Sequence, residues 1–464
     1  MRPVLKLFAC CILILSALHL LYFAIISKST NSKEREIFPL KPPKTAENPN
    51  DSKYGSVQEF KELSQESSYE FANQSCIFGH QVFLDHHDVL RILSAKQVEH
   101  CEPIRNVALV KTHKCASDLM AYILMRHADI HSLEVLLPRK RGSNLGYGTQ
   151  KRFVIELPSR LQDRKFQLMT LHTQFNFDYW SQLMQAPSAL IGMVRHPLDQ
   201  FSSFFNYYDM EESLREGFPL LDEASSTFDF FLKHSQQLTV GAWKRQWSSQ
   251  QVHPGSLRDT MLFDYGAYHS KNRTKLAQDI VRNFSIVLVQ ERFDESLVLL
   301  KTVLNWGYED ILYQPKNEAG NYKISSENKR NASLYLNRLH LHMIQSPHDY
   351  TLYDLSMKNF NQQIALIEKF SEKVKEFRQI NQKVSKWCYE RLRHLNMLQQ
   401  FRPLPKLTRY LTMVGTRKHQ STTMSFTSEF TNEIVTVNEV SCFKMQLDML
   451  DFVQFHIQKY HGLN

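Results

Sequence analysis

The chain has 464 residues, of which 42% are hydrophobic and 12% are aromatic. This composition excludes a largely disordered protein, and the length allows one large domain with extensions or two domains. The formal charge of +9 fits simple solubility, an anionic ligand or a negatively charged membrane surface, so charge alone does not choose among them.

The first feature in chain order is an apolar segment at residues 7–27, which carries no Asp, Glu, Lys or Arg. A membrane-spanning helix needs about 20 apolar residues, whereas the apolar part of a cleaved signal has about 7–15. The length therefore predicts a retained signal anchor. Arg2 and Lys6 precede it, and the positive-inside rule then predicts a cytosolic tail at 1–6 and a luminal body, a single-pass type II topology.

Residues 28–75 are rich in Lys, Glu, Pro, Asn and Ser, which is typical of a stem between an anchor and a domain. A folded luminal domain is expected at 76–464. Asn-x-Ser/Thr sequons favour a glycosylated luminal protein, and they lie at Asn50, Asn73, Asn272, Asn283 and Asn331.

Cysteine usage fits an oxidising lumen. Two of the seven cysteines, Cys10 and Cys11, lie in the apolar segment. Four of the other five are able to form two bridges whose connectivity the sequence leaves open; these five are Cys76, Cys101, Cys115, Cys388 and Cys442. No Cys-x-x-Cys or Cys/His ligand spacing is present, so the sequence predicts no metal site.

Short apolar segments alternate with helical patterns from residue 106 onward. Strands are expected at 106–110, 166–171, 188–194 and 284–289, and helices at 117–128, from Pro197, at 294–306 and over 355–397. This alternation predicts an α/β fold in which helices flank a largely parallel sheet.

The loop at 111–117 joins the first of these strands to a helix. Its residues are Lys111, Thr112, His113, Lys114, Cys115, Ala116 and Ser117. Amides at a helix N-terminus, lysines and a hydroxyl are groups that bind phosphate, although the loop lacks the glycines of a nucleotide-binding P-loop. The alternative is a polar turn in which Ser117 caps the helix.

A second candidate phosphate site follows the strand at 188–194. Arg195 ends the strand, and Ser203 lies in the helix that begins at Pro197. Arginine binds phosphate with two parallel hydrogen bonds. The alternative is an arginine at a strand end and an ordinary helix serine.

Together these segments resemble the galactose-3-O-sulfotransferase family, which includes galactosylceramide sulfotransferase and belongs to the sulfotransferase superfamily. The matching segments are VALVKTHKCAS, RHPLDQFSSFFNYY and LVQERFDESLVLLK. The resemblance implies a P-loop-like parallel sheet and transfer of a sulfuryl group from 3′-phosphoadenosine 5′-phosphosulfate (PAPS). The implied acceptor is the 3-OH of a terminal galactose on a glycolipid, such as galactosylceramide, or on a glycan. The resemblance further implies residence in the Golgi membrane, no metal requirement and no nucleic-acid partner.

Roles carry over by position within the family pattern. Lys114 resembles the lysine that contacts the transferring sulfuryl group, and the loop at 111–117 would hold the 5′-phosphate. Arg195 and Ser203 would hold the 3′-phosphate. The sequence departs from the pattern at Cys115, where threonine is usual, at Asp118, where a hydroxyl residue is usual, and at His196, where aspartate is usual.

Asp118 places negative charge beside the phosphate site and motivates an alternative, a catalytically impaired luminal protein that binds PAPS or a glycan. A Golgi glycosyltransferase shares the anchor, stem and sequons, but no Asp-x-Asp metal motif is present. A P-loop kinase would need a glycine-rich loop.

Two histidines are candidates for the base that takes the proton of the acceptor hydroxyl. His172 follows the strand expected at 166–171 and resembles the strand-end histidine that serves as base in this family and in uronyl 2-O-sulfotransferases. His113 lies within the phosphate loop. The sequence favours His172 as base and His113 as a residue that shapes the site or orients the acceptor.

Overall fold

The computed structural model describes residues 82–95, 102–138, 144–146, 164–217, 226–240, 254–267, 270–314, 323–394, 422–447, 451–453 and 455–456. The chain divides into two units, Met1–Ser68 and Tyr69–Asn464, and every described residue belongs to the second. The expected tail, anchor and stem lie outside the described residues. Among the helices that are described, none is long and apolar enough to cross a bilayer.

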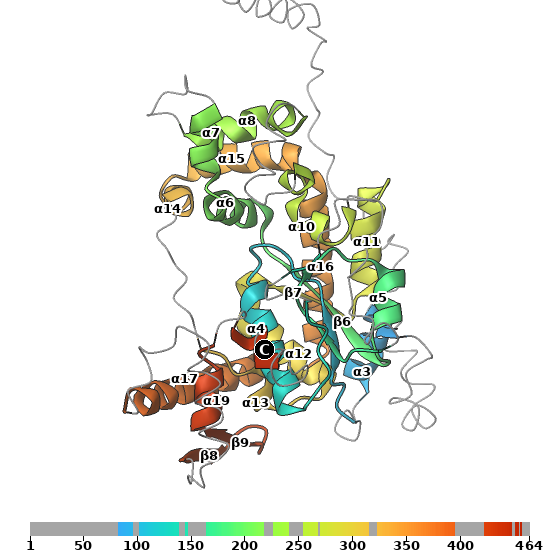
Figure 1. Cartoon of the computed structure of the whole chain (residues 1–464), viewed down its shortest axis with the longest axis vertical. Helices are drawn as coiled ribbons and strands as arrows, with labels where there is room; N and C mark the ends of the chain where they lie inside the picture. Colours follow the sequence, from blue (N-terminus) through green and yellow to red (C-terminus); the bar gives the residue numbers. More distant parts are fainter. Residues whose placement is uncertain are drawn as a thin grey trace, which may run out of the picture. The chain divides into compact units, whose positions relative to one another are not determined.

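A five-stranded parallel sheet lies at the centre of this unit (Figure 1). Its strands are β1 (Phe83–Leu84), β2 (Asn106–Leu109), β4 (Leu168–Met169), β6 (Ser188–Val194) and β7 (Ile286–Val289). β2 and then β4 lie on one side of β6, while β1 and β7 pair with successive parts of its other edge. All seven residues of β6 are buried, as expected for a parallel sheet covered on both faces.

Helices cover the sheet and extend beyond it. The larger ones are α3 (His86–Ser94), α4 (Ser117–Ile130), α5 (Phe177–Leu183), α6 (Pro197–Tyr207), α7 (Met210–Gly217), α8 (Thr227–Val240), α11 (Arg273–Asn283), α12 (Phe293–Leu304), α14 (Lys323–Arg330), α15 (Ala332–Gln345), α16 (Pro347–Ala365) and α17 (Phe370–His394). The shorter ones are α10 (Thr260–Asp264), α13 (Tyr308–Ile311), α19 (Glu439–Lys444) and the 3₁₀ turns η4 (Pro254–Leu257) and η6 (Gln290–Arg292). Two small sheets pair β3 (Asn144–Gly146) with β5 (His172–Thr173), and β8 (Thr423–Thr427) with β9 (Ile434–Asn438).

The predicted α/β fold with a parallel sheet is confirmed, and β6 occupies the whole of the strand expected at 188–194. α6 begins at Pro197, because the fixed φ of proline suits the first turn of a helix. The single helix expected over 355–397 is wrong. Lys369 has φ 52°, and this left-handed residue separates α16 from α17.

A second apolar cluster lies beyond the sheet, between α6, α7, α8 and α15, which Figure 1 shows together. Aromatic rings packed in stacked, tilted and edge-to-face pairs dominate it, among them Phe201, Phe204, Phe205, Phe228 and Phe231. Burying a phenylalanine side chain stabilises a fold by roughly 1.5–3 kcal/mol, so this cluster holds α6 firmly in place. The segment that carries Ser203 is therefore rigidly positioned.

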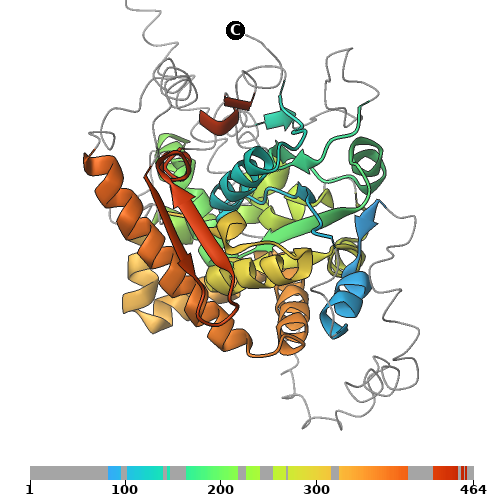
Figure 2. The ribbon, with the colours of Figure 1, turned by 90° about the horizontal axis from the view of Figure 1, so that it is seen from below.

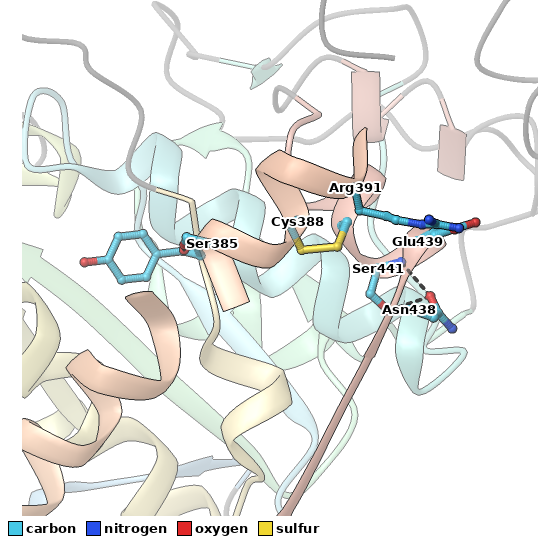
Figure 3. The surroundings of a disulfide bond; sticks show 8 residues. Ser385, Cys388, Arg391, Asn438, Glu439 and Ser441 are labelled. Atoms are coloured by element: carbon cyan, nitrogen blue, oxygen red, sulfur yellow. Dashed lines mark hydrogen bonds and ion pairs between the residues drawn. A yellow bond between two sulfur atoms is a disulfide. The ribbon is translucent and has the colours of Figure 1, made fainter. Parts of the chain in front are cut away.

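The region beyond 397, in which the sequence shows no clear pattern, packs through its described part on α17. α19 packs against that helix, and the hairpin of β8 and β9 lies beside it (Figure 2). A disulfide joins Cys388 of α17 to Cys442 of α19, and an Arg391–Glu439 ion pair lies next to it (Figure 3). Cys115 is a free, buried cysteine, whereas Cys76 and Cys101 lie outside the described residues.

Replacing Cys388 and Cys442 together with serine is expected to lower the free energy of unfolding by about 2–4 kcal/mol. The bridge closes a segment with a sequence separation of 54, which restricts the unfolded chain, and both cysteines are fully buried. Denaturant unfolding of the full chain measures the effect. A Cys115→Ser variant serves as control, because that thiol takes part in no bridge. An unfolding energy unchanged in the double variant would show that the bridge does not form.

Candidate functional site

The loop at 111–117 connects β2 to α4 at the carboxyl end of the sheet. Lys114 and Ala116 have φ 58° and 59°, so the backbone turns sharply twice before the helix begins. Ala116 is the N-cap residue and supplies no side-chain hydrogen bond. The hydroxyl of Ser117 instead donates back to the carbonyl of Thr112 at 2.5 Å. The predicted alternative, a turn capped by Ser117, is therefore wrong, and the first amides of α4 have no side-chain cap, which suits an anion.

Lys111 is a buried lysine, with a side chain that is 0% exposed. Its Nζ lies 2.5 Å from Oδ1 of Asp118 and 2.6 Å from Nε2 of His172. Burial lowers the pKa of Lys111, while Asp118 opposes that shift. A buried ammonium group is costly unless it is paired, so Asp118 and His172 stabilise it in this position.

The buried Lys111 ammonium determines the protonation states of both of its partners, His172 and Asp118. Burial, and then the charge of Lys111, lowers the pKa of His172 well below its ordinary value, so its ring stays neutral. An ammonium group only donates, so the lone pair at Nε2 of His172 is directed to Lys111. Loss of surrounding water favours the neutral form of Asp118, but the charge of Lys111 outweighs this and lowers the pKa of Asp118.

His113 is held by a carboxylate that sequence reasoning did not identify. The backbone N–H of His113 donates to Oδ2 of Asp264 at 2.8 Å, and its ring Nδ1 lies 2.9 Å from both carboxylate oxygens. The His113 ring also stacks on His172 with a centroid distance of 4.6 Å. A carboxylate that accepts Nδ1–H leaves the lone pair at Nε2, which is the orientation of a general base.

Two groups of hydrogen bonds hold the segment that carries Asp264 beside the loop. The carboxylate of Asp349 accepts two amides at the start of α10, the short helix that ends at Asp264. The hydroxyl of Tyr265 donates to the carbonyl of Met193 and accepts its N–H, at 3.0 and 2.8 Å. A side chain at Gly192 would overlap that hydroxyl. A glycine in β6 therefore allows the close approach that positions Asp264.

The second predicted segment lies against the same loop. Nη1 of Arg195 donates to the carbonyl of Lys114 at 3.2 Å, and Nε2 of Gln200 donates to the carbonyl of His113 at 2.8 Å. The Lys114 ammonium lies 4.0 Å from the ring centre of Tyr207, a cation–π contact. Arg195 thus meets the loop at 111–117 directly, while Ser203 is buried in α6.

The structure brings together Lys111, His113, Lys114, Ser117, His172 and Arg195, all predicted from the sequence. The residues that reasoning missed are Asp264, Gln200 and Glu291, whose carboxylate accepts the N–H of His196. No local pattern marks Asp264, because 151 residues separate it from His113.

Three of the predicted sequons lie in the described part of the chain. Asn272 and Asn331 are exposed, and each caps a helix through Oδ1 rather than through Nδ2, the atom that carries a glycan. Asn283 is partly exposed at the end of α11. Asn50 and Asn73 lie outside the described residues. Glycosylation of all five stays a prediction.

Asp118→Asn is expected to tighten the binding of a phosphate-bearing donor roughly 2- to 5-fold at low salt, the range of an exposed charge interaction. The Asp118 side chain is 65% exposed and lowers the net positive charge that Lys111 brings to the loop. Raised salt should remove most of the gain. Affinity titrations at two salt concentrations test this, with Asp178→Asn, an exposed aspartate on α5, as control. An unchanged affinity at low salt would show that Asp118 does not act on the anion.

Comparisons with known proteins point to one family. A family model described as galactose-3-O-sulfotransferase matches residues 57–410. Galactose-3-O-sulfotransferase 2 of Sus scrofa is 31% identical over 223 residues, 46% of this chain and 52% of that protein. Galactosylceramide sulfotransferase of Homo sapiens is 30% identical over 222 residues, 46% of this chain and 48% of that protein.

The chain thus spans about half the length of the curated relatives it matches. No solved structure matches it. The family model, in contrast, extends over well more than half of the chain and includes the loop at 111–117, Arg195 and Asp264. The chain therefore belongs to the galactose-3-O-sulfotransferase family.

Proposed function

We propose that this protein transfers a sulfuryl group from PAPS to the 3-OH of a terminal galactose on a glycolipid or glycan. The observation that carries the proposal is that three features lie together: the start of α4, which no side chain caps, Arg195, and the His113–Asp264 pair. The start of α4 and Arg195 suit a donor with two phosphate groups. The His113–Asp264 pair suits removal of a proton from a hydroxyl group.

The residues present fit PAPS as donor. The amides at the start of α4, that of Ser117 among them, would hold the 5′-phosphate, and Arg195 would hold the 3′-phosphate, together with Ser203 as the family resemblance implies. When bound, PAPS supplies the sulfuryl group and a phosphate leaving group. Lys114 is partly exposed at the mouth of the loop, whereas Lys111 is buried and paired. Lys114 is therefore the lysine we assign to the transferring group.

We assign the general base to His113 rather than to His172, the residue that the sequence favours. Asp264 accepts Nδ1–H of His113, so Nε2 takes the proton of the acceptor hydroxyl as the new oxygen–sulfur bond forms and the bond to the leaving phosphate breaks. The lone pair of His172 is directed to Lys111, and its pKa is lowered, so it is a weak base. His172 then serves to position Lys111.

The alternative of a catalytically impaired binding protein rested on Asp118. That carboxylate is bonded to Lys111, which offsets its charge. Asp118 is therefore expected to weaken donor binding only a few-fold, which gives no reason to expect an inactive protein.

Transfer of label from PAPS to a panel of galactosides by the purified full chain tests the function. The panel should include galactosylceramide, N-acetyllactosamine and a matched 3-deoxygalactoside, which lacks the acceptor hydroxyl. We expect labelling of the first two acceptors only, and weaker PAPS binding in Arg195→Ala. PAPS binding without transfer would identify a binding protein, and label at another hydroxyl would overturn the 3-OH assignment.

We further propose a type II topology in the Golgi membrane, supported by the apolar segment at 7–27 and the basic residues before it. Protease protection of the domain in sealed vesicles tests it. Digestion of the domain without detergent would contradict a luminal location.

A further inference from the structure

Two histidines and an aspartate meet at the end of α4 that lies away from the phosphate loop. His127 and His131 are one helical turn apart, and α13, which carries Asp310, packs against α4. Nδ1 of His127 lies 2.9 Å from Oδ1 of Asp310, and Nε2 of His131 lies 2.8 Å from the same oxygen. All three ligand atoms lie within 4.8 Å of one another.

The groups around this cluster orient its lone pairs. Nε2 of His127 lies 3.3 Å from the carbonyl of Arg105, and the ring stacks on Trp306. Metal-binding histidines almost always donate their second N–H to such an acceptor. The N–H of Gly307 occupies Oδ2 of Asp310. A neutral His127 has one N–H for two oxygen acceptors, Asp310 and the carbonyl of Arg105, so one ring nitrogen turns its lone pair toward an oxygen. When Nε2–H donates to Arg105, a cation between Nδ1 and Asp310 would remove that repulsion.

Local charge is compatible with a dication. Asp310 and Glu309 each carry one negative charge, and buried Arg126 offsets one of them through its bonds to the carbonyls of these two residues. The C-terminal end of α4 adds a partial negative charge from the helix dipole. His131 is 25% exposed, so solvent reaches the cluster.

We propose that His127, His131 and Asp310 bind a zinc ion, with water as the fourth ligand. Two imidazoles and one carboxylate suit zinc, whereas calcium and magnesium prefer oxygen ligands alone. Ligand atoms of a tetrahedral zinc lie about 3.3 Å apart, so small ring rotations admit the ion. The sequence does not reveal this site, because the site contains no cysteine and because Asp310 lies 183 residues from His127.

The role of this ion is structural. His127 and His131 follow the first residue of α4, Ser117, by 10 and 14 residues, so the site lies about 15–20 Å from the loop at 111–117 and takes no part in transfer. The ion would tie α4 to α13 and to the segment that enters β2, and α4 carries the loop amides at its other end.

Metal analysis of the purified full chain, equilibrated with zinc and then dialysed, tests the proposal. We expect about one zinc per chain, and visible absorption typical of tetrahedral cobalt when cobalt replaces it. His131→Ala and Asp310→Asn should each weaken zinc binding by at least about 100-fold. His87→Ala, a change of an exposed histidine on α3, should bind as the wild type does.

Asp310→Asn also separates the metal site from a network in which both histidines simply donate to Asp310. Asparagine keeps one oxygen, which can accept from the two histidines at the Oδ1 position, and it loses only the acceptor for the Gly307 N–H, so the fold should persist with a small loss of stability while zinc is lost. A chelator should lower the Tm of the wild type but not of this variant. A wild-type chain without zinc, or variants that retain it, would overturn the proposal.

Discussion

Replacing His113 with alanine is expected to lower kcat by about 10²- to 10⁴-fold, with the affinity for PAPS near that of the wild type. The ring Nδ1 of His113 is held 2.9 Å from the Asp264 carboxylate, which orients Nε2 to take the acceptor proton. The amides and Arg195, which would hold the donor, are unchanged. Single-turnover kinetics together with donor titration separates the two effects.

Two further variants sharpen this test. Asp264→Asn keeps an oxygen for the backbone N–H of His113 but permits the wrong ring tautomer, so kcat should fall strongly again. His172→Gln keeps an acceptor for Lys111 and should be much milder. A larger loss in His172→Gln than in His113→Ala would reverse the assignment of the base.

Lys114→Ala is expected to lower kcat by about 10²- to 10³-fold, or about 2.7–4 kcal/mol of barrier, through loss of a cation that stabilises charge growing on the leaving oxygen. The Lys114 ammonium lies against Tyr207 at the surface of the site, so its removal leaves no buried charge unpaired. Initial-rate measurements at saturating donor give the effect.

The control is Lys275→Ala, which removes an exposed lysine on α11 and should leave the rate unchanged. Lys114→Arg keeps the charge with a different shape and should recover part of the rate. A Lys114→Ala enzyme within a few-fold of the wild-type rate would rule out this role. Lys111 would then be the next lysine to test.

The sequence by itself determined several local elements and the place of the loop at 111–117 between a strand and a helix. β6 could be predicted because a buried parallel strand is a continuous apolar segment, and α6 because proline favours the first turn of a helix. The lysines of the loop at 111–117 were identified because a polar loop between a strand and a helix places charge at a helix N-terminus. Each of these signals acts within a few residues.

Only the tertiary structure decided which groups act together. His113 meets Asp264 across 151 residues, and Lys111 meets His172 across 61. These pairings depend on strand order in the sheet and on Tyr265 packing over Gly192, so no local pattern contains them. The sequence favoured His172 as base because it stands at a strand end. The fold favours His113, because a buried lysine takes the lone pair of one ring while a buried carboxylate orients the other.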